Sequence, residues 1–328
     1  MIGRLHSDRE FRWPIGASLV RHALQRSVYA ASLMAATVLF SFLLFQLVPT
    51  DPARIALGAN ASDAQVTALR QQLGLDRPLV EQFVTYVTSV LSGDLGRSFI
   101  DGRLVSQEVG TKFLLSAALT TLASSFAALY LLAQVTFSRN GRTPSIFSAL
   151  NNAFTALPTM FIAILALRWV FADYPFSYYP GTLWALEGWG FMLPPAIVLA
   201  FYPMGILGKI AEREFDRLAK QPYVLAARAR GIDERGILWR YLFPNSLITM
   251  LSSYTTLLPL LLTGSFIIEI MFSVPGLGAL LLKAVLNRDL PMLQGIVIVA
   301  TAFTVLIHLL IELAYPAIDP RIAEHRLV

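Results

Sequence analysis

Four ionisable side chains lie within long apolar stretches of the sequence, where they could pass a proton along: Arg168, Glu269, His308 and Glu312. His308 and Glu312 are four residues apart, so they share one face if their stretch is helical. Ionisable groups inside a membrane often mark an ion pathway. The other interpretation is structural, because Arg168, Glu269 and Glu312 lie near the ends of their stretches, where charged side chains reach the interface or pair. We favour the structural interpretation and keep the proton relay as the alternative.

The sequence contains no catalytic or nucleotide-binding motif. The four histidines, His6, His22, His308 and His325, are scattered, and neither His-Glu-x-x-His nor Gly-x-Ser-x-Gly occurs. The nearest approach to a phosphate-binding loop, residues 205–210, lacks both the spacing and the hydroxyl that would meet magnesium. We therefore expect a protein that is not an enzyme and holds no metal or cofactor of its own. Any nucleotide must be bound on another chain.

The composition is typical of proteins that cross a membrane several times. Of the 328 residues, 55% are hydrophobic and 14% are charged, and the mean hydropathy is +0.60. The net charge of +5 comes from basic residues dispersed in short connectors, so we expect no nucleic-acid partner. The absence of cysteine excludes disulfides. The first apolar run is about 22 residues long and follows a charged leader, so we expect it to stay as an anchor.

Hydropathy predicts an all-α integral membrane protein with six transmembrane helices, each long enough to cross roughly 30 Å of hydrocarbon. The predicted spans are 27–49, 113–137, 146–171, 191–210, 246–271 and 295–315. Four prolines fall in the third and fourth spans, and we expect them to kink their helices where protein neighbours can satisfy the freed carbonyls. They are Pro158, Pro194, Pro195 and Pro203.

The positions of Lys and Arg predict the orientation. They cluster before the first span and after the second, fourth and sixth, so these segments and both termini are expected to be cytoplasmic. The connector 172–190 has neither residue, which favours an outer position. The resulting division is a cytoplasmic leader 1–26, a first transmembrane helix 27–49, an outer-face helical segment 50–112, a transmembrane core 113–315 with a cytoplasmic loop 211–245, and a cytoplasmic tail 316–328.

The outer-face segment is expected to form two amphipathic helices. The first begins at a capping box, Ser62 to Gln65, and stops at Gly74, and the second is opened by Pro78 and closed by Gly93. Their apolar faces must be buried against the membrane helices or a partner, because no disulfide supports the segment. We expect a partner to contact three residues of the second helix, and a packed lid without a role of its own is the alternative. The three are Leu79, Phe83 and Val87.

The cytoplasmic loop contains a segment, 223–244, that combines two short helices with a glycine between them. Residues 226–230 favour a helix, and Gly231 is placed as its left-handed cap. Asp233 is placed to cap the free N–H groups of the next helix, which should run to about residue 243. Pro244 then ends that helix or opens another. Geometry alone would equally allow an interfacial hairpin that merely joins two spans.

The spacing in this segment resembles the loop signature of binding-protein-dependent ABC importer permeases. That signature reads Glu-Ala-Ala, three residues, Gly, nine residues, Ile, any residue, Leu-Pro. Here Ala226 and Ala227, Gly231 and Pro244 match it. Leu225 stands in the place of the glutamate, which puts any salt bridge of that glutamate in doubt. Tyr241 and Phe243 replace the isoleucine and the leucine.

Further motifs narrow the resemblance to the first permease subunit of dipeptide, oligopeptide and nickel importers. In chain order they are 74–79, 93–98, Glu269, 271–278, 287–289, Pro291, 294–295 and 319–322. They cover most of the chain from the first span onward. Each motif alone is weak, but their order identifies the chain as a member of the family.

This resemblance implies a type I ABC importer permease-like fold in the bacterial inner membrane. It also implies a second homologous permease subunit, two ATPase subunits that bind ATP and Mg²⁺, an extracytoplasmic solute-binding protein and membrane lipid. The residues it implies for contact with the ATPase are Tyr223, Ala226, Ala227, Arg228, Gly231, Ile232, Asp233 and Pro244. The expected substrate is a peptide, with nickel or an oligosaccharide as other candidates. The alternative from another class is a secondary transporter driven by an ion gradient.

Overall fold

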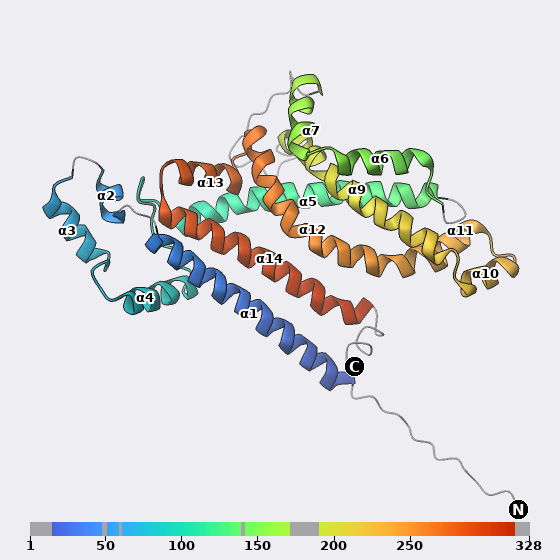
Figure 1. Ribbon diagram of the computed structural model, residues 1–328, viewed down its shortest axis with the longest axis horizontal. Helices are drawn as coiled ribbons and strands as arrows, with labels where there is room; N and C mark the ends of the chain where they lie inside the picture. Colours follow the sequence, from blue (N-terminus) through green and yellow to red (C-terminus); the bar gives the residue numbers. More distant parts are fainter. Residues whose placement is uncertain (1–14, 48–50, 59–60, 139–141, 171–189, 319–328) are drawn as a thin grey trace, which may run out of the picture.

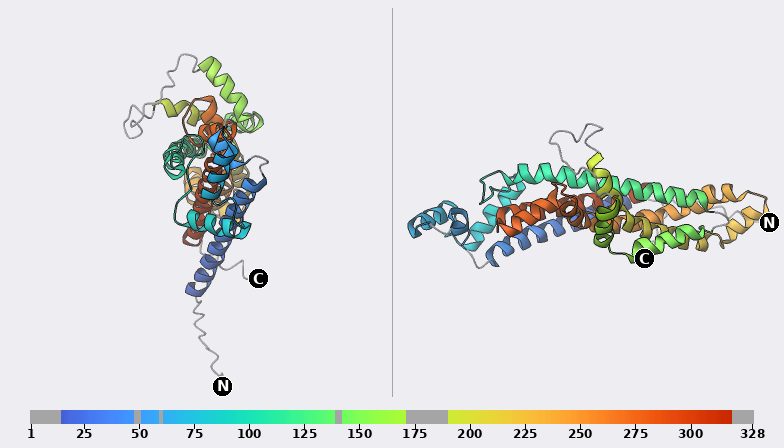
Figure 2. Two further views of the ribbon diagram at one scale, coloured as in Figure 1. Left: turned by 90° about the vertical axis from the view of Figure 1, so that its left-hand side faces the viewer. Right: turned by 90° about the horizontal axis from the view of Figure 1, so that it is seen from above.

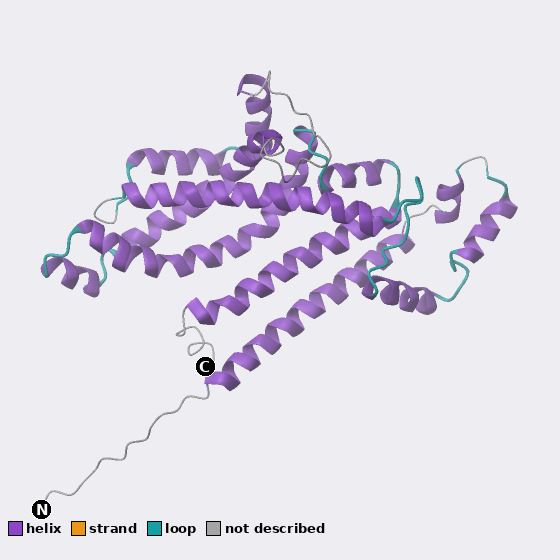
Figure 3. Ribbon diagram, turned by 180° about the vertical axis from the view of Figure 1, so that it is seen from behind, coloured by secondary structure: helices purple, strands orange, loops and turns teal. Residues whose placement is uncertain are grey.

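The computed structural model describes residues 15–47, 51–58, 61–138, 142–170 and 190–318 (Figure 1). Within these ranges every regular element is helical, and Arg97 and Leu104 form an isolated β-bridge (Figure 3). The all-α prediction is therefore confirmed. The predictions for the leader before residue 15, for the connector 172–189 and for the tail after residue 318 lie outside the described residues.

Five helices in the described part of the chain are long and apolar enough to cross a membrane, and a bent pair can supply a sixth span. The five are α1 (Ile15–Leu47), α5 (Val105–Phe137), α9 (Leu193–Leu218), α12 (Phe243–Met271) and α14 (Leu290–Ile318). They correspond in order to the first, second, fourth, fifth and sixth spans expected from hydropathy. The multi-pass architecture follows from apolar segment length, as predicted.

The third expected span is not one kinked helix. It consists of α6 (Ser145–Ala156) and α7 (Thr159–Leu165), and a π-helical turn, η1 (Ala166–Val170), continues α7. The two halves are bent by 100°. The cause is Pro158, because proline disfavours helical backbone at the residue before it, and Leu157 is accordingly extended with ψ 128°. Pro158 therefore begins a new helix instead of kinking a continuous one.

The prolines of the fourth span also need a correction. Pro194 and Pro195 lie in the first turn of α9, where a helix requires no N–H donor, so they open the helix and do not kink it. A short 3-10 turn, η2 (Gly190–Met192), leads into them. Pro203 lies inside α9, as expected, and Pro259 is an interior proline of α12 that we did not single out.

Helices extend past the boundaries expected from hydropathy. α1 begins at Ile15 although the first span was expected at 27, and α5 begins at Val105, eight residues before 113. A hydropathy window detects only the apolar part of a helix, and the hydrogen-bonded ladder continues into polar sequence. The divisions at residues 26 and 112 therefore fall inside helices.

α9 is the centre of the bundle, since it packs against α5, α6 and α12. In the apolar stretch of α9, 61% of the residues are buried, whereas in that of α1 only 11% are buried. α1 instead lies beside α14, and the two are joined by an ion pair of 2.8 Å between Arg26 and Glu312 (Figure 1). Seen from above, the helices run along the length of an elongated body (Figure 2). Most of the surface of α1 is thus not covered by the other described parts of the chain.

The segment between the first two spans forms three short helices at one end of the bundle: α2 (Pro52–Leu57), α3 (Asp63–Gln72) and α4 (Leu79–Leu91) (Figure 1). The expected capping box between Ser62 and Gln65 is present, with both reciprocal bonds. α4 is held on α1 by a ring contact of 5.2 Å between Phe83 and Phe42. α2 was not expected, because its six residues are too few for a periodic signal.

Candidate functional site

The segment that matched the loop signature folds at the end of the bundle opposite α2–α4. It forms α10 (Pro222–Ala229) and α11 (Glu234–Ile237), followed by a π-helical turn, η3 (Leu238–Leu242) (Figure 1). The turn continues without a break into α12, so helical structure runs from Glu234 to Met271. Pro244 therefore opens α12 and does not end a separate helix, and the π-helical turn precedes this residue, which has no N–H.

Gly231 forms the left-handed turn between α10 and α11, with φ 78°. Its N–H donates to the carbonyl of Arg228 at 2.9 Å, and the N–H of Ile232 donates to the carbonyl of Ala227 at 3.2 Å. This pair of bonds is the Schellman motif, in which the residue after the cap closes the last helical turn. The predicted cap and its following apolar residue are both confirmed.

Asp233 occupies the N-cap position of α11 with extended backbone, as expected, but its side chain makes no capping hydrogen bond. Its carboxylate lies where the side chain of residue 236 would otherwise be: a Cβ added to Gly236 would lie 2.7 Å from Asp233 Oδ1. The expected role of the carboxylate as a cap is therefore wrong. Its position depends on glycine at 236.

The two alanines of the signature point in different directions. Ala227 is buried with Val224 in an apolar cluster that also contains Phe215 and Leu218 of α9. The remaining members come from α5, α9, α11, η3 and α12: Val135, Ala211, Ile237, Leu238, Leu242 and Met250. Ala226 is exposed. The small residue at 227 lets α10 lie close to the bundle, and that at 226 leaves the outer face of α10 accessible.

Arg228 joins the parts of the segment to one another. Its guanidinium pairs with the carboxylate of Glu234 at 2.9 and 3.2 Å and also donates to the carbonyl of Ala219 at 3.3 Å. Arg228, which belongs to α10, thus contacts both the end of α9 and the start of α11. This side chain was expected to contact an ATPase subunit, and in the structure its donors are used within the chain.

The outward face of α10 consists of apolar and small residues. Tyr223 is 42% exposed and Leu225 is 51% exposed, with Ala226 beside them. Leu225 makes no contribution to the buried cluster, so the residue in the glutamate's place is free to meet another molecule. The Tyr223 ring is supported from within the chain by Tyr241, at a centroid distance of 6.3 Å.

The ionisable residues of the spans have structural partners. Glu312 pairs with Arg26, His308 Nδ1 lies 3.2 Å from the carbonyl of Thr304, and the guanidinium of Arg168 lies over the ring of Trp169. Among the described residues these groups form no continuous chain, and no three His, Asp or Glu residues are placed to hold a metal. This arrangement favours the structural interpretation.

Glu269 is fully buried and accepts the N–H of Gly278 at 2.7 Å. Gly278 belongs to α13 (Leu277–Leu286), a short helix that lies at the same end of the bundle as α2–α4 (Figure 1). The sequence gave no sign of this contact.

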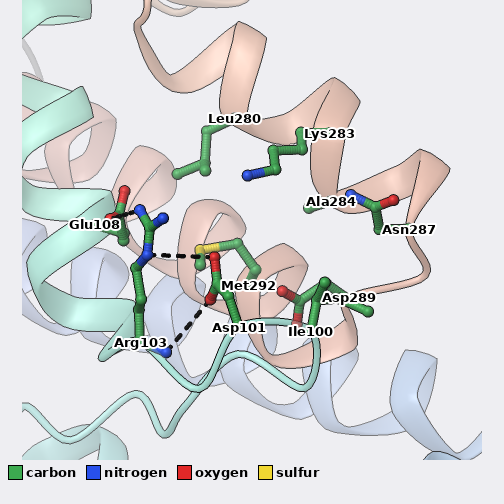
Figure 4. Close-up of a pocket in the computed structure, with 10 residues that line it drawn as sticks. All are labelled: Ile100, Asp101, Arg103, Glu108, Leu280, Lys283, Ala284, Asn287, Asp289 and Met292. Carbon is green, nitrogen blue, oxygen red and sulfur yellow. Dashed lines mark hydrogen bonds and ion pairs between the residues drawn. The ribbon is translucent and has the colours of Figure 1, made fainter. Parts of the chain in front are cut away.

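A small pocket lined by charged and apolar side chains also lies beside α13 (Figure 4). Arg103 pairs there with Glu108 and Asp101, at 2.6 and 3.4 Å, and Lys283 extends from α13 on the opposite wall. Burial acts to raise the pKa of Asp101, but hydrogen bonds and the positive charges of Arg103 and Lys283 outweigh it, so the pKa is lowered. The cavity of about 30 Å³ is large enough for a water molecule but not for a peptide. Sequence reasoning did not find it, because its residues come from two stretches far apart in the sequence, 100–108 and 280–292.

A second group that the sequence did not reveal is a buried amide cluster near the other end of the bundle. Gln134 of α5 donates to the carbonyl of Gly208 in α9 at 2.9 Å, and Asn151 of α6 donates to Gln134 at 3.3 Å. A Cβ at residue 208 would overlap the Asn151 side chain. The cluster fixes three helices to one another with every amide bonded.

Comparisons with known proteins agree with this architecture. Residues 113–324 match the family described as binding-protein-dependent transport system inner membrane component, and residues 19–121 match the N-terminal family of such membrane components. A peptide transport system permease protein of Brucella abortus is 31% identical over 310 residues, 91% of this chain and 98% of that protein. Glutathione transport system permease proteins of Pectobacterium atrosepticum and Salmonella choleraesuis are 32% and 30% identical, over 86% and 93% of this chain and 92% and 99% of theirs.

Proposed function

Because the chain belongs to the family of binding-protein-dependent inner membrane components, as an ABC importer permease of the peptide type, we propose that it forms half of a peptide's path across the bacterial inner membrane. In this proposal ATP hydrolysis on separate subunits drives the movement. The chain receives that energy through the segment Tyr223–Pro244.

The observation that carries the proposal is the rigid connection of this segment to the bundle. α10 is tied to the end of α9 through the buried cluster and through Arg228, and helical structure runs from Glu234 to Met271. A displacement of α10 by a partner therefore moves α9 and α12 together. The exposed face of Tyr223, Leu225 and Ala226 is the surface that the partner would contact.

The proposed assembly contains this chain, a second homologous permease subunit, two ATPase subunits and an extracytoplasmic solute-binding protein. ATP and Mg²⁺ would bind to the ATPase subunits, where they supply the energy of the cycle. The sparsely buried surface of α1 is suited to contact with lipid or with the second permease. A ligand can shift such a cycle only if it binds the inward-open and outward-open states differently.

A peptide is the substrate class best supported. The names of the relatives refer to peptide and to glutathione, which is itself a tripeptide. Nickel or an oligosaccharide would be less well matched to these relatives. A path with few fixed charges suits a substrate whose side chains vary, since specificity can then reside in the external binding protein.

The test is purification of the tagged chain from its native membrane, followed by reconstitution of the complex into liposomes with a labelled tripeptide as the probe. We expect two ATPase subunits to copurify, and uptake to require both ATP and the binding protein. Glutathione, Ni²⁺ and an oligosaccharide serve as competing probes. Uptake by the isolated chain under a proton gradient, without ATP, would instead establish a secondary transporter.

A further inference from the structure

The first turn of α13 has no cap of its own and is held by side chains from two other helices. Its N-cap residue is Gly276, which has no side chain. The N–H of Leu277 donates to Ser116 Oγ of α5 at 2.8 Å, and the N–H of Gly278 donates to Glu269 Oε2 of α12 at 2.7 Å. Two donors that a helix start leaves unsatisfied are thus bonded by two different spans.

The close approach requires glycine at both positions. A Cβ on Gly276 would overlap the carboxylate of Glu269 and lie 2.7 Å from Ser116 Oγ, and a Cβ on Gly278 would overlap the backbone of Phe266. The second carboxylate oxygen of Glu269 lies 3.0 Å from the hydroxyl of Ser265, which belongs to α12 as well. The site is therefore fitted closely around one carboxylate.

Burial of this carboxylate calls for a functional reason. Glu269 has no exposed surface, and none of the ion pairs of the described residues includes it. A buried carboxyl group is costly unless it is hydrogen-bonded, and the two oxygens of Glu269 accept from the Gly278 N–H and the Ser265 hydroxyl. The only backbone amide that its side chain binds, among the described residues, belongs to α13.

The far end of α13 is fixed as well. Arg288 adopts the left-handed conformation with φ 55°, and the next residue, Asp289, accepts the N–H of Phe99 at 3.2 Å and a hydrogen bond of 2.5 Å from Ser98. These contacts attach the end of α13 to the outer-face segment, beside the pocket of Figure 4. α13 is thus hydrogen-bonded to α5 and α12 at its start and to the loop that precedes α5 just after its end.

Because its two amides bond to different spans, both bonds at the start of α13 can persist only while α5 and α12 keep their relative positions. An N–H···O bond weakens outside about 2.7–3.2 Å, so a relative shift of roughly 1 Å breaks one of the two. We propose that Glu269, with Ser116, is the positioning residue that seats α13 as a gate at the outer end of the path, and that this seat opens in each transport cycle. The gate role rests on the proposed function.

Cysteine labelling tests the seat directly, because the chain has no native cysteine. Ala284 of α13 is 3% exposed, so Ala284→Cys should react slowly with a membrane-impermeant maleimide while α13 is seated. In the full-length chain in liposomes, we expect Ser116→Ala or Glu269→Ala to raise that rate about tenfold, the loss expected for one hydrogen bond to a buried partner. Leu286→Cys, 73% exposed, should react equally fast in every background.

Glu269→Gln keeps an oxygen that can accept the Gly278 N–H, and it should restore slow labelling. Thr121→Ala is the matched control for Ser116→Ala, since Thr121 is an exposed residue of α5 whose hydroxyl donates to the carbonyl of Ala117 within the same helix. In the assembled importer, Ser116→Ala and Glu269→Ala should also increase ATP hydrolysis measured without the binding protein. If the role of Ser116 and Glu269 were merely structural, the two alanine variants would have a lower melting temperature but the same ATP hydrolysis as the wild type. Glu269→Gln would then have no raised activity to reverse.

Unchanged labelling of Ala284→Cys in Ser116→Ala and Glu269→Ala would overturn the proposal. If Glu269→Ala does not assemble, Ser116→Ala decides, because it leaves the carboxylate in place. The labelling experiment needs no ATPase subunit. Its result can therefore be interpreted even if the proposal on energy coupling fails. Faster labelling with unchanged ATP hydrolysis in the assembled importer would reject the gate role while retaining the seat.

Discussion

The guanidinium of Arg228 and the carboxylate of Glu234 form a two-point ion pair across the Gly231 turn, with Nε–Oε1 and Nη2–Oε2 distances of 2.9 and 3.2 Å. The pair fixes the angle between α10 and α11. Since the two side chains are 30% and 38% exposed, it adds about 1 kcal/mol or less to stability. The pair therefore matters mainly because it orients α10 relative to α11.

Replacing Arg228 with lysine should therefore affect coupling more than folding. Lysine keeps the charge but cannot form the two parallel bonds. We expect the free energy of unfolding to fall by less than about 1 kcal/mol, and ATP-driven uptake of the tripeptide probe to fall about fivefold or more. Arg230→Lys, on the exposed side of the turn, is the control. Normal uptake by Arg228→Lys would show that the angle between the helices is unimportant.

A second prediction concerns Gly231, whose φ of 78° is unfavourable for residues with a side chain. A Cβ at this position would have no neighbour within 4 Å, so any effect of a substitution arises from the backbone and not from crowding. Gly231→Val should lose ATP-driven uptake while the protein remains in the membrane. Gly231→Asn should retain most of it, because asparagine tolerates the left-handed region. Equal activity of the two variants would remove the coupling role of the turn.

Leu225 supplies a third prediction, because the structure leaves it 51% exposed on the outer face of α10. Leu225→Glu restores the residue of the loop signature and should change the free energy of unfolding by no more than about 0.5 kcal/mol. If an apolar site on the ATPase receives this leucine, the affinity between the two should fall at least about tenfold. Val224→Glu, at a fully buried neighbour, should unfold the cluster. Unchanged affinity would mean that α10 docks through another face.

The span order, the Schellman turn at Gly231 and the capping box at Ser62 could all be predicted, because each depends on residues close together in the sequence. The apolar length of a span and the spacing of a cap are local properties. Pro158 was predicted to kink the third span. Whether a proline kinks one helix or separates two depends on the contacts available to each half, which the sequence does not show. Pro194 and Pro195 were misjudged because a shift of two residues in the start of α9 decides whether a proline lies in the first turn or inside the helix.

The contacts of Glu269 could not be predicted in the same way. The Gly278 amide that it accepts belongs to another helix, and Ser116, which bonds the neighbouring amide, precedes Glu269 by more than a hundred residues, so no periodicity links these positions. The same holds for Asp289 with Ser98. Tertiary hydrogen bonds of this kind depend on how helices pack, and a single sequence does not determine that packing.

Sidedness gives a fourth prediction. Ala226 and Leu79 are both exposed, at opposite ends of the bundle, and either can carry a single cysteine in a chain that has none. In intact cells stripped of their outer membrane, an impermeant maleimide should label Leu79→Cys and should label Ala226→Cys only after the inner membrane is opened. A bifunctional reagent should link Ala226→Cys to an ATPase subunit. Labelling in the opposite order would reverse the orientation predicted from Lys and Arg.

The last prediction separates the two faces of α4. Leu79 is 59% exposed, whereas the ring of Phe83 packs on Phe42 of α1, with centroids 5.2 Å apart. Leu79→Ser should therefore leave the melting temperature unchanged and weaken binding of the extracytoplasmic solute-binding protein, measured on the detergent-solubilised complex. Phe83→Ser should instead loosen α4 from α1, because an aromatic pair is worth about 0.5–1.5 kcal/mol beyond the area it buries.

Protease sensitivity of the segment 50–112 distinguishes these effects, since it should rise in Phe83→Ser and not in Leu79→Ser. Val87 is half-buried and should behave in an intermediate way. If binding of the solute-binding protein is equally strong in wild type and in Leu79→Ser, the exposed face of α4 has no such partner. The helix would then be a lid whose role ends with its contact to α1.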